Sequence, residues 1–249
     1  MNEYLNEISL AKDTVNSAIS ALKNKLSEIK KYQFDNSLAK EMKAEVDSLI
    51  EEIILEKLTP TGLDILSEEI GSIKLGSGKK KRWVVDPLDG TVNFIRGLGA
   101  CGISVALCLD NQPIFGVIGT YPSCDLVWGG RGMGAFLNNF PIQVSMVSDK
   151  LKAVLCTGVP SRFDFTKNNF ESMYKDFESF GKIRMLGSAS ISLLQVAKGS
   201  ADAYCEKNIM IWDVAAGLAI LEGAGGRVEM YPGCEKNSWE IYADNGFLS

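Results

Sequence analysis

The stretch WVVDPLDGTVNF, residues 83–94, places two aspartates at the end of a short apolar run. Asp86 and Asp89 stand three residues apart with a proline and a leucine between them, and Gly90 and Thr91 follow at once. Asp-Pro and Asp-Gly pairs commonly form turns, which would explain each aspartate separately. A turn does not explain why both aspartates follow a β-rich Trp-Val-Val segment. We therefore expect this stretch to carry chemistry as well as a turn.

Further carboxylates stand at comparable places along the chain. Glu68 and Glu69 follow a predicted strand at 63–66, and Asp213 stands at the start of a predicted helix, where an N-cap is the commoner role. Catalytic groups collect at strand ends in layered α/β proteins, and clustered carboxylates repel one another unless a cation lies among them. Oxygen ligands without histidine or thiolate suit Mg²⁺. The sequence therefore predicts a magnesium site.

Histidine is absent from all 249 residues. This absence excludes hydrolases that pair serine or cysteine with histidine, histidine phosphatases, and zinc sites with histidine ligands. The chemistry must come from carboxylates, hydroxyls, lysines or metals.

The charge and cysteine patterns favour a cytoplasmic protein that does not bind nucleic acid directly. The chain has 26 basic and 31 acidic residues, a net charge of −5, and its densest basic run, residues 79–82, is typical of a solvated turn. The six cysteines form no C-x-x-C pair, and we find neither a signal peptide nor an apolar run of membrane-spanning length. We expect reduced thiols and a cytoplasmic location.

The remaining pattern predicts an α+β or layered α/β fold in one unit. Apolar residues recur every three or four positions from Leu5 to Ile29 and from Leu38 to Leu58, which predicts two amphipathic helices. Further helices are expected at 168–180, 187–199 and 212–226. Strands are expected at 63–66, 82–86, 151–158, 201–206, 227–231 and 240–244, with a hairpin over 101–121 around an Asp110-Asn111-Gln112 turn. We expect a single domain, 1–249, of two closely packed halves, about 1–145 and 146–249.

Aspartyl phosphatases of the haloacid dehalogenase type also end a strand in Asp-Gly-Thr. They need the spacing D-x-D, in which the nucleophile and the acid/base lie on one side of the turn. Here the spacing is D-x-x-D with a proline between the aspartates. This difference argues against a covalent aspartyl-phosphate mechanism.

Several separated motifs resemble the inositol monophosphatase family, part of the lithium-sensitive, magnesium-dependent phosphatase superfamily that also holds fructose-1,6-bisphosphatases. WVVDPLDGTVNF is similar to the family's W-I-x-D-P-[IL]-D-G-T-x-N-F, and WDVAAG at 212–217 is similar to its second signature. SEE at 67–69 resembles the family's G-E-E, and 116–138 resembles its connecting segment with paired glycines. The similarity runs from about Asp35 to the C-terminus, and the D-P-L-D-G-T-x-N-F stretch is highly specific.

The resemblance implies a site for two or three magnesium ions. Glu68, Asp86 and the backbone carbonyl of Leu88 would hold one ion. Asp86, Asp89 and Asp213 would hold a second.

The resemblance also implies catalytic roles for Glu68, Asp47 and Thr91. Asp47 matches the aspartate of the family's T-x-A-D, so it would hold a loosely bound third ion or orient the attacking water, which Thr91 would assist. Ala44 stands where the family has threonine. A solvated position on a helix is the alternative role for Asp47.

Substrate binding is implied for a set of turn and helix residues. Backbone N–H groups near Gly90 and Ser188 would hold the phosphate, and Glu206 matches the family's acidic residue that receives substrate hydroxyls. The alternative for Glu206 is a surface glutamate, paired with Lys207. The implied substrate-binding residues are Gly90, Thr91, Gly187, Ser188, Ala189, Glu206 and Asp213.

The family resemblance implies a five-layer α-β-α-β-α sandwich, a homodimer, and a final helix that is lost or very short here. The expected function is magnesium-dependent hydrolysis of a sugar or polyol phosphate, with inositol 1-phosphate as the leading candidate. Fructose 1,6-bisphosphate, alone or in addition, histidinol phosphate and an adenosine bisphosphate remain alternative substrates. A role as a regulatory binding partner of the transcription or RNA machinery is the non-enzyme alternative.

Overall fold

The computed structural model describes residues 2–29, 36–75, 80–159 and 165–249. Lys79 of the basic run lies outside the described residues, as do the side chains of Leu26, Ile29, Leu38 and Met42 in the predicted helices. Among the described residues, no helix combines the length and the apolar character needed to cross a bilayer.

The described chain forms six α-helices and two β-sheets. The helices are α1 Leu5–Ile29, α2 Asn36–Leu58, α3 Thr91–Arg96, α4 Lys167–Phe177, α5 Ala189–Ala197 and α6 Ile211–Gly223. The larger sheet contains β1 Asp64–Ser67, β2 Gly71–Ile73, β3 Lys81–Asp89, β4 Cys101–Leu109, β5 Gln112–Tyr121, β6 Leu126–Gly130, β7 Gly134–Leu137 and β8 Phe140–Pro141. The smaller sheet contains β9 Val154–Thr157, β10 Lys182–Met185, β11 Ala203–Met210, β12 Arg227–Pro232 and β13 Ser238–Asp244.

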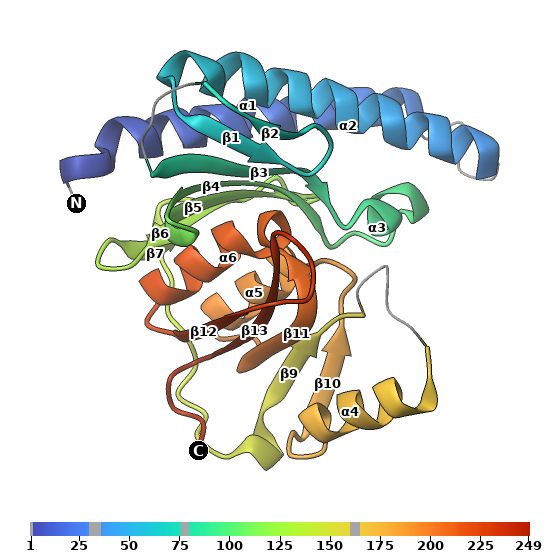
Figure 1. Ribbon diagram of the computed structural model, residues 1–249, viewed down its shortest axis with the longest axis vertical. Coiled ribbons are helices and arrows are strands. Elements are labelled where there is room, and N and C mark those ends of the chain that lie inside the picture. The colour runs from blue at the N-terminus through green and yellow to red at the C-terminus, as the bar shows by residue number, and fades with distance from the viewer. Residues whose placement is uncertain (1, 30–35, 76–79, 160–164) are drawn as a thin grey trace.

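The elements stack in five layers, as predicted (Figure 1). Helices α1 and α2 cover one face of the larger sheet, whose strand order is β2-β1-β3-β4-β5-β6-β7-β8. Helices α5 and α6 lie between this sheet and the smaller one, ordered β10-β9-β11-β13-β12, and α4 lies on the outer side of the smaller sheet.

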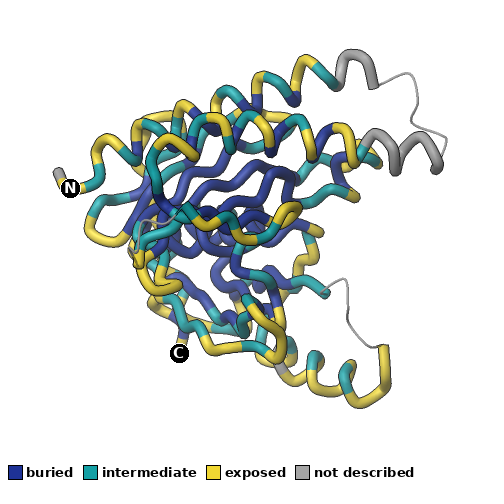
Figure 2. The backbone as a smooth tube through the Cα atoms, turned by 45° about the horizontal axis from the view of Figure 1, so that its top comes forward, coloured by how far each residue is buried: buried dark blue, intermediate teal, exposed yellow. Residues whose placement is uncertain are grey.

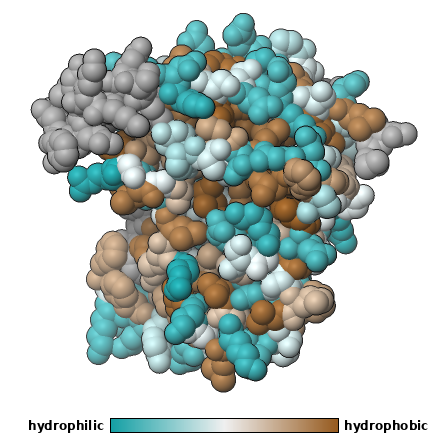
Figure 3. All heavy atoms as spheres, turned by 180° about the vertical axis from the view of Figure 1, so that it is seen from behind, coloured by the Kyte–Doolittle hydropathy of each residue, from teal (hydrophilic) through white to brown (hydrophobic). Residues whose placement is uncertain are grey.

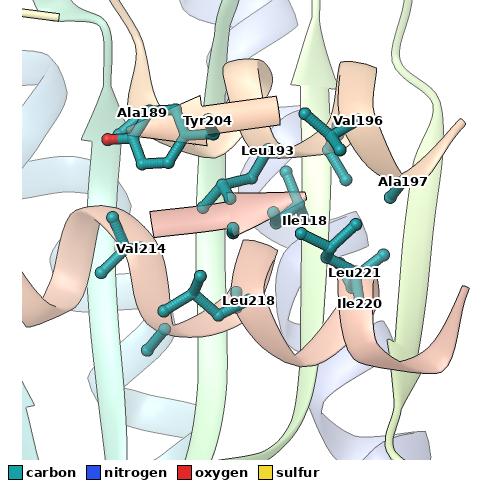
Figure 4. Close-up of a cluster of buried hydrophobic side chains, with 14 of the residues drawn as sticks. Ile118, Ala189, Leu193, Val196, Ala197, Tyr204, Val214, Leu218, Ile220 and Leu221 are labelled. Carbon is teal, nitrogen blue, oxygen red and sulfur yellow. The ribbon is translucent and has the colours of Figure 1, made fainter. Parts of the chain in front are cut away.

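Side-chain alternation along the strands builds the layers. Trp83 and Val85 of β3 pack toward α1 and α2, whereas Val84 between them packs toward α5 and α6. The central strands are therefore buried on both faces, and the outer helices are buried on one side only (Figure 2). Figure 4 shows the inner cluster, where Leu193 of α5, Leu218 of α6 and Ile118 of β5 meet.

Several elements differ from the sequence predictions in extent. Strand β3 continues through Asp89, so both aspartates lie inside the strand, with a register irregularity after Asp86. Gln112 is the first residue of β5 and not part of the turn. Strands β2, β6, β7, β8 and β10 were not predicted, because each is only two to five residues long and so gives little pattern to recognise. No helix occurs among residues 245–249.

Candidate active site

Three carboxylates from distant parts of the chain converge at one end of the larger sheet. Oxygen atoms of Glu68, Asp86 and Asp213 all lie within 4.8 Å of one another. β1 pairs in parallel with β3, with Ser67 opposite Val85, so the next residues, Glu68 and Asp86, are neighbours. Asp213 comes from the first turn of α6. The predicted carboxylate cluster therefore exists in the folded chain.

Asp86 lies at the centre of this cluster and is completely buried. Its Oδ1 accepts a hydrogen bond from the backbone N–H of Leu88 at 2.9 Å, but its Oδ2 has no hydrogen-bond partner. Burial raises the pKa of Asp86 well above its usual value, and Glu68, Asp89 and Asp213 raise it further. Since buried polar atoms are normally paired, the Oδ2 atom needs a partner such as a cation.

The two other carboxylates share this electrostatic problem. Partial burial raises the pKa of Glu68, which lies at the exposed rim, and burial raises that of Asp213 well above its usual value, with Asp89 adding to it. The N-cap role considered for Asp213 is wrong, because Met210 occupies the N-cap position and Asp213 lies inside the helix. An all-oxygen donor set with excess negative charge fits Mg²⁺.

Asp89 lies beside the cluster and is held by the start of α5. Its Oδ2 accepts hydrogen bonds from the Ser188 hydroxyl at 2.5 Å and from the Ser190 N–H at 2.7 Å. Ser188 is also the N-cap of α5, where its hydroxyl accepts from the N–H of Ile191. Burial raises the pKa of Asp89, while these hydrogen bonds oppose the shift. The predicted second-ion ligand therefore also connects β3 to the predicted phosphate loop.

Two glycine turns bring the predicted phosphate-binding segments together. Gly90 has φ +80°, and a Cβ atom there would lie 2.9 Å from the Ala100 oxygen and 3.1 Å from the Ser188 Cβ. Gly187 has φ +73° and approaches Asn93, whose side-chain amide donates to the Leu186 carbonyl at 2.6 Å. These contacts place the turn after β3 against the turn before α5.

Thr91 and the Leu88 carbonyl interact with each other in the turn after β3. The Thr91 hydroxyl donates to the Leu88 oxygen at 3.0 Å. Ala189, the last member of the predicted phosphate loop, is the first residue of α5. Its backbone N–H faces Asp89, which it helps to keep ionised.

Glu206 is buried inside β11, so the predicted alternative of a surface glutamate is wrong. Its Oε2 accepts a hydrogen bond from the hydroxyl of Tyr204 at 2.9 Å. Its carboxylate lies against Gly158, where an added Cβ would clash with the Glu206 Oε2 atom. Burial raises the pKa of Glu206 to about 7, although the Tyr204 hydrogen bond lowers it. The carboxylate is therefore fixed in direction and shielded from bulk water.

Asp47 lies on the face of α2 that packs toward the site and is 5% exposed, so its alternative role as a solvated helix residue is wrong. Burial raises its pKa to about 7; Lys43 opposes this shift, and Glu69 and Glu68 add to it. Lys43 is ion-paired to Asp47, with Nζ 3.6 Å from Oδ2.

A cavity of about 950 Å³ opens beside the carboxylates. Glu68, Asp213 and Glu206 line it, and so do Met173 and Phe177 of α4. The cavity is large enough for a small polar ester to reach the carboxylates, and part of its wall is apolar.

Several residues of the site were not anticipated from the sequence. The backbone N–H of Ser190 donates to Asp89, and the side-chain amide of Asn93 donates to the carbonyl of Leu186. Each of these hydrogen bonds joins residues about a hundred positions apart in the sequence. Tyr204 belongs to the same strand as Glu206 with one residue between them, a spacing that places both on one face and could have indicated the contact. Lys43 stands four residues before Asp47, a helical ion-pair spacing that was also visible.

The sequence and structure comparisons agree with this geometry. The model of the inositol monophosphatase family matches residues 3–248. The match begins closer to the N-terminus than residue 35, where the sequence motifs placed the start of the similarity. "Fructose-1,6-bisphosphatase/inositol-1-monophosphatase" of Aquifex aeolicus is 35% identical over 208 residues, covering 82% of this chain and 78% of that protein. "Nus factor SuhB" of Pasteurella multocida is 33% identical over 206 residues, covering 82% and 75%.

Solved structures lead to the same family. The inositol monophosphatase from Anabaena (Nostoc) sp. PCC 7120 is 30% identical and superposes with a TM-score of 0.82, covering 97% of this chain and 91% of that one. The match spans both sheets and the helices between them. The chain therefore belongs to the inositol monophosphatase family of phosphatases.

Proposed function

We propose that the chain hydrolyses a sugar or polyol phosphate, with inositol 1-phosphate as the leading candidate, in a Mg²⁺-dependent reaction. The observation that carries this proposal is the Glu68–Asp86–Asp213 cluster, with the unpartnered Asp86 Oδ2 atom, beside a cavity that also contains Glu206. When bound, Mg²⁺ would stabilise negative charge on the phosphate and leaving oxygen and lower the pKa of a water molecule.

The chain's own residues divide the remaining tasks. The ions would be held by Glu68, Asp86, Asp89, Asp213 and the Leu88 carbonyl. Backbone N–H groups of the turns at 90–91 and 187–188 would face the phosphate, because helix starts favour anions. The N–H of Ala189, which the sequence also placed there, faces Asp89 instead. Asp47 and Thr91 would orient the attacking water.

Glu206 is the residue on which the preference for a polyol rests. A buried carboxylate that already has one donor retains acceptor positions for the hydroxyls of an alcohol. An alcohol without such hydroxyls would leave the buried carboxylate unsatisfied, which is unfavourable.

A phosphate-release panel tests this proposal. The purified chain is assayed with inositol 1-phosphate, fructose 1,6-bisphosphate, histidinol phosphate, an adenosine bisphosphate and an aryl phosphate, with and without Mg²⁺. We expect release from the polyol esters only with Mg²⁺, partial replacement by Mn²⁺, and inhibition by Li⁺. Full activity in excess chelator would contradict the metal-dependent reaction.

A regulatory binding role is the second candidate, because relatives about one-third identical carry the name Nus factor SuhB. Absence of phosphate release from every ester, together with intact metal binding, would favour this role. We further infer a homodimer in the cytoplasm. All six cysteines lie in the described part of the chain and none of them forms a disulfide, which supports a reducing compartment.

A further inference from the structure

Lys43 lies at the edge of the carboxylate cluster, where helix α2 meets the turn after β1. Its Nζ atom is 3.6 Å from Asp47 Oδ2 and 3.9 Å from Glu69 Oε1. Glu69 adjoins Glu68, one of the three clustered carboxylates. The ammonium group therefore bridges two elements that both contribute acidic groups to the candidate site.

The charges around Lys43 are predominantly negative. Asp47 is buried, Glu69 lies at the rim, and the charge of Glu68 reaches Asp47 as well. The positive charge of Lys43 lowers the electrostatic repulsion among Asp47, Glu68 and Glu69. In the metal-dependent reaction proposed above, an additional ion at Asp47 would have the same effect.

We propose that the Lys43 ammonium group takes the place of an additional divalent ion at Asp47, so that the site binds two such ions and not three. This inference rests on the proposed function, because it concerns the same metal site. An ion on Asp47 would need carboxylate oxygens within about 2.0–2.1 Å for Mg²⁺, and it would then lie close to the Lys43 ammonium, whose Nζ is 3.6 Å from Asp47 Oδ2. Like charges repel strongly at such separations, even near a protein surface.

Ala44 strengthens the argument from the ligand side. It lies on α2 between Lys43 and Asp47, and its methyl group offers no oxygen to a cation. Glu45 at this turn of α2 is exposed and ion-paired to Lys25, with 3.4 Å between Nζ and Oε2. The side chains that face the site here are therefore the Asp47 carboxylate and the Lys43 ammonium, whose charges offset each other. Such a turn disfavours a further divalent ion.

The experiment counts the ions bound to the full chain. The protein is stripped with chelator, dialysed, and titrated with Mn²⁺ by calorimetry and by electron paramagnetic resonance. The test variant is Lys43→Met, which keeps the unbranched shape of the side chain, shortens it by one atom and removes its charge. The matched control is Lys57→Met on the same helix, which breaks an ion pair with Asp13 instead. Lys43→Arg keeps the charge.

We expect two bound ions in the wild type, Lys57→Met and Lys43→Arg. Lys43→Met should gain a third ion that binds more weakly than the other two, because the affinity of the Asp47 position rises on the order of tenfold or more when the positive charge is removed. Adding Asp47→Asn to Lys43→Met should remove that ion. If Lys43→Met does not fold, Lys43→Gln replaces it, since Lys43 is partly exposed and a polar side chain is accommodated there.

A third ion in the wild type, or only two ions in the charge-removing variant, would overturn the role of Lys43. Absence of Mn²⁺ binding in every protein would overturn both this inference and the metal-dependent function. The pattern of two ions in the wild type and three in Lys43→Met, without phosphate release from any ester, would leave the inference standing and remove the proposed function alone.

Discussion

The Asp86 carboxylate is the group around which the other site residues are arranged. It is fully buried, its Oδ1 accepts a hydrogen bond from the backbone N–H of Leu88, and its Oδ2 has no hydrogen-bond partner. A buried carboxylate of this kind costs stability unless it is protonated or bound to a cation. Its neighbours Glu68 and Asp213 increase that cost and so favour a divalent ion.

Asp213→Asn tests the cluster directly, because it keeps the shape and removes one charge. We expect a loss of about 3–4 kcal/mol in transition-state stabilisation, or roughly a hundred- to a thousand-fold in kcat/KM. The chelated variant should be at least as stable as the wild type, since repulsion falls. Asp110→Asn is the matched control, because Asp110 lies in an exposed turn at φ +48°, which asparagine also adopts. Near-normal turnover in Asp213→Asn would remove it from the site.

Tyr204→Phe tests the fixed direction of Glu206. The change removes the hydroxyl that donates to Oε2, so the carboxylate loses a partner and its orientation. We expect the loss of this hydrogen bond to cost about 1.5–3 kcal/mol in transition-state stabilisation, so kcat/KM for inositol 1-phosphate should fall roughly ten- to a hundred-fold. The value of kcat/KM for an aryl phosphate should fall less. Glu206→Gln should show the same selectivity and keep the magnesium requirement. Tyr174→Phe, at an exposed tyrosine of α4 that does not line the cavity, is the control. Equal losses on both substrates would contradict a role in reading the alcohol.

At the scale of elements, α6 determines where Asp213 lies. The helix packs against β5 at Gly116, where an added Cβ would clash with the backbone oxygen of Ala216. On the other face of the same strand, Gly119 packs against the Ile19 and Val15 side chains of α1. Both glycines allow a helix to approach the sheet closely, but only the first contact is with backbone atoms.

This difference predicts unequal effects of the two alanine variants. Gly116→Ala should lower the free energy of unfolding by about 1–3 kcal/mol or more, because the backbone of α6 must shift. Gly119→Ala should cost less, since the ends of Ile19 and Val15 can adjust. Urea unfolding of the chelated proteins measures both values. A larger loss at Gly119 would show that α1, and not α6, is the more rigidly held layer.

At the scale of the whole molecule, the buried carboxylates make stability depend on pH. Their pKa values are raised in the folded state, to about 7 for Asp47 and Glu206 and above the usual range for Asp86. A raised acid pKa favours the protonated form on folding. The stability it contributes is present below the unfolded pKa of about 4 and is lost as the pH rises through the folded pKa.

The chelated protein should therefore melt at a lower temperature at pH about 8 than at pH about 5, by roughly 5 °C or more. Saturating Mg²⁺ or Mn²⁺ should reduce this difference, because the ion binds the ionised carboxylates. Asp86→Asn should reduce it without metal. Thermal unfolding in matched ionic strength checks all three results. A chelated melting temperature that rises with pH over this range would contradict the raised pKa values.

On the face opposite to that of Figure 1, the described residues form no single apolar or polar patch. Polar and apolar side chains are intermixed over the face seen from behind in Figure 3.

Local patterning determined much of this protein. The helical periods of α1 and α2, the hairpin of β4 and β5, and the strand that ends in Asp86 and Asp89 follow from residue spacing within a few turns. The choice of carboxylates as the reactive groups also follows from the sequence, since no histidine is available. The motif around Asp86 was specific enough to indicate the family.

Tertiary structure alone decided how these groups meet. Parallel pairing of β1 with β3 brings Glu68 to Asp86, and packing of α5 and α6 between the sheets brings Ser188 and Asp213 to them. Periodicity records which face of an element is apolar, but it does not record which elements pair, because pairing is settled by long-range packing. For the same reason the burial of Glu206, the unpartnered oxygen of Asp86 and the position of Lys43 emerge only from the folded chain.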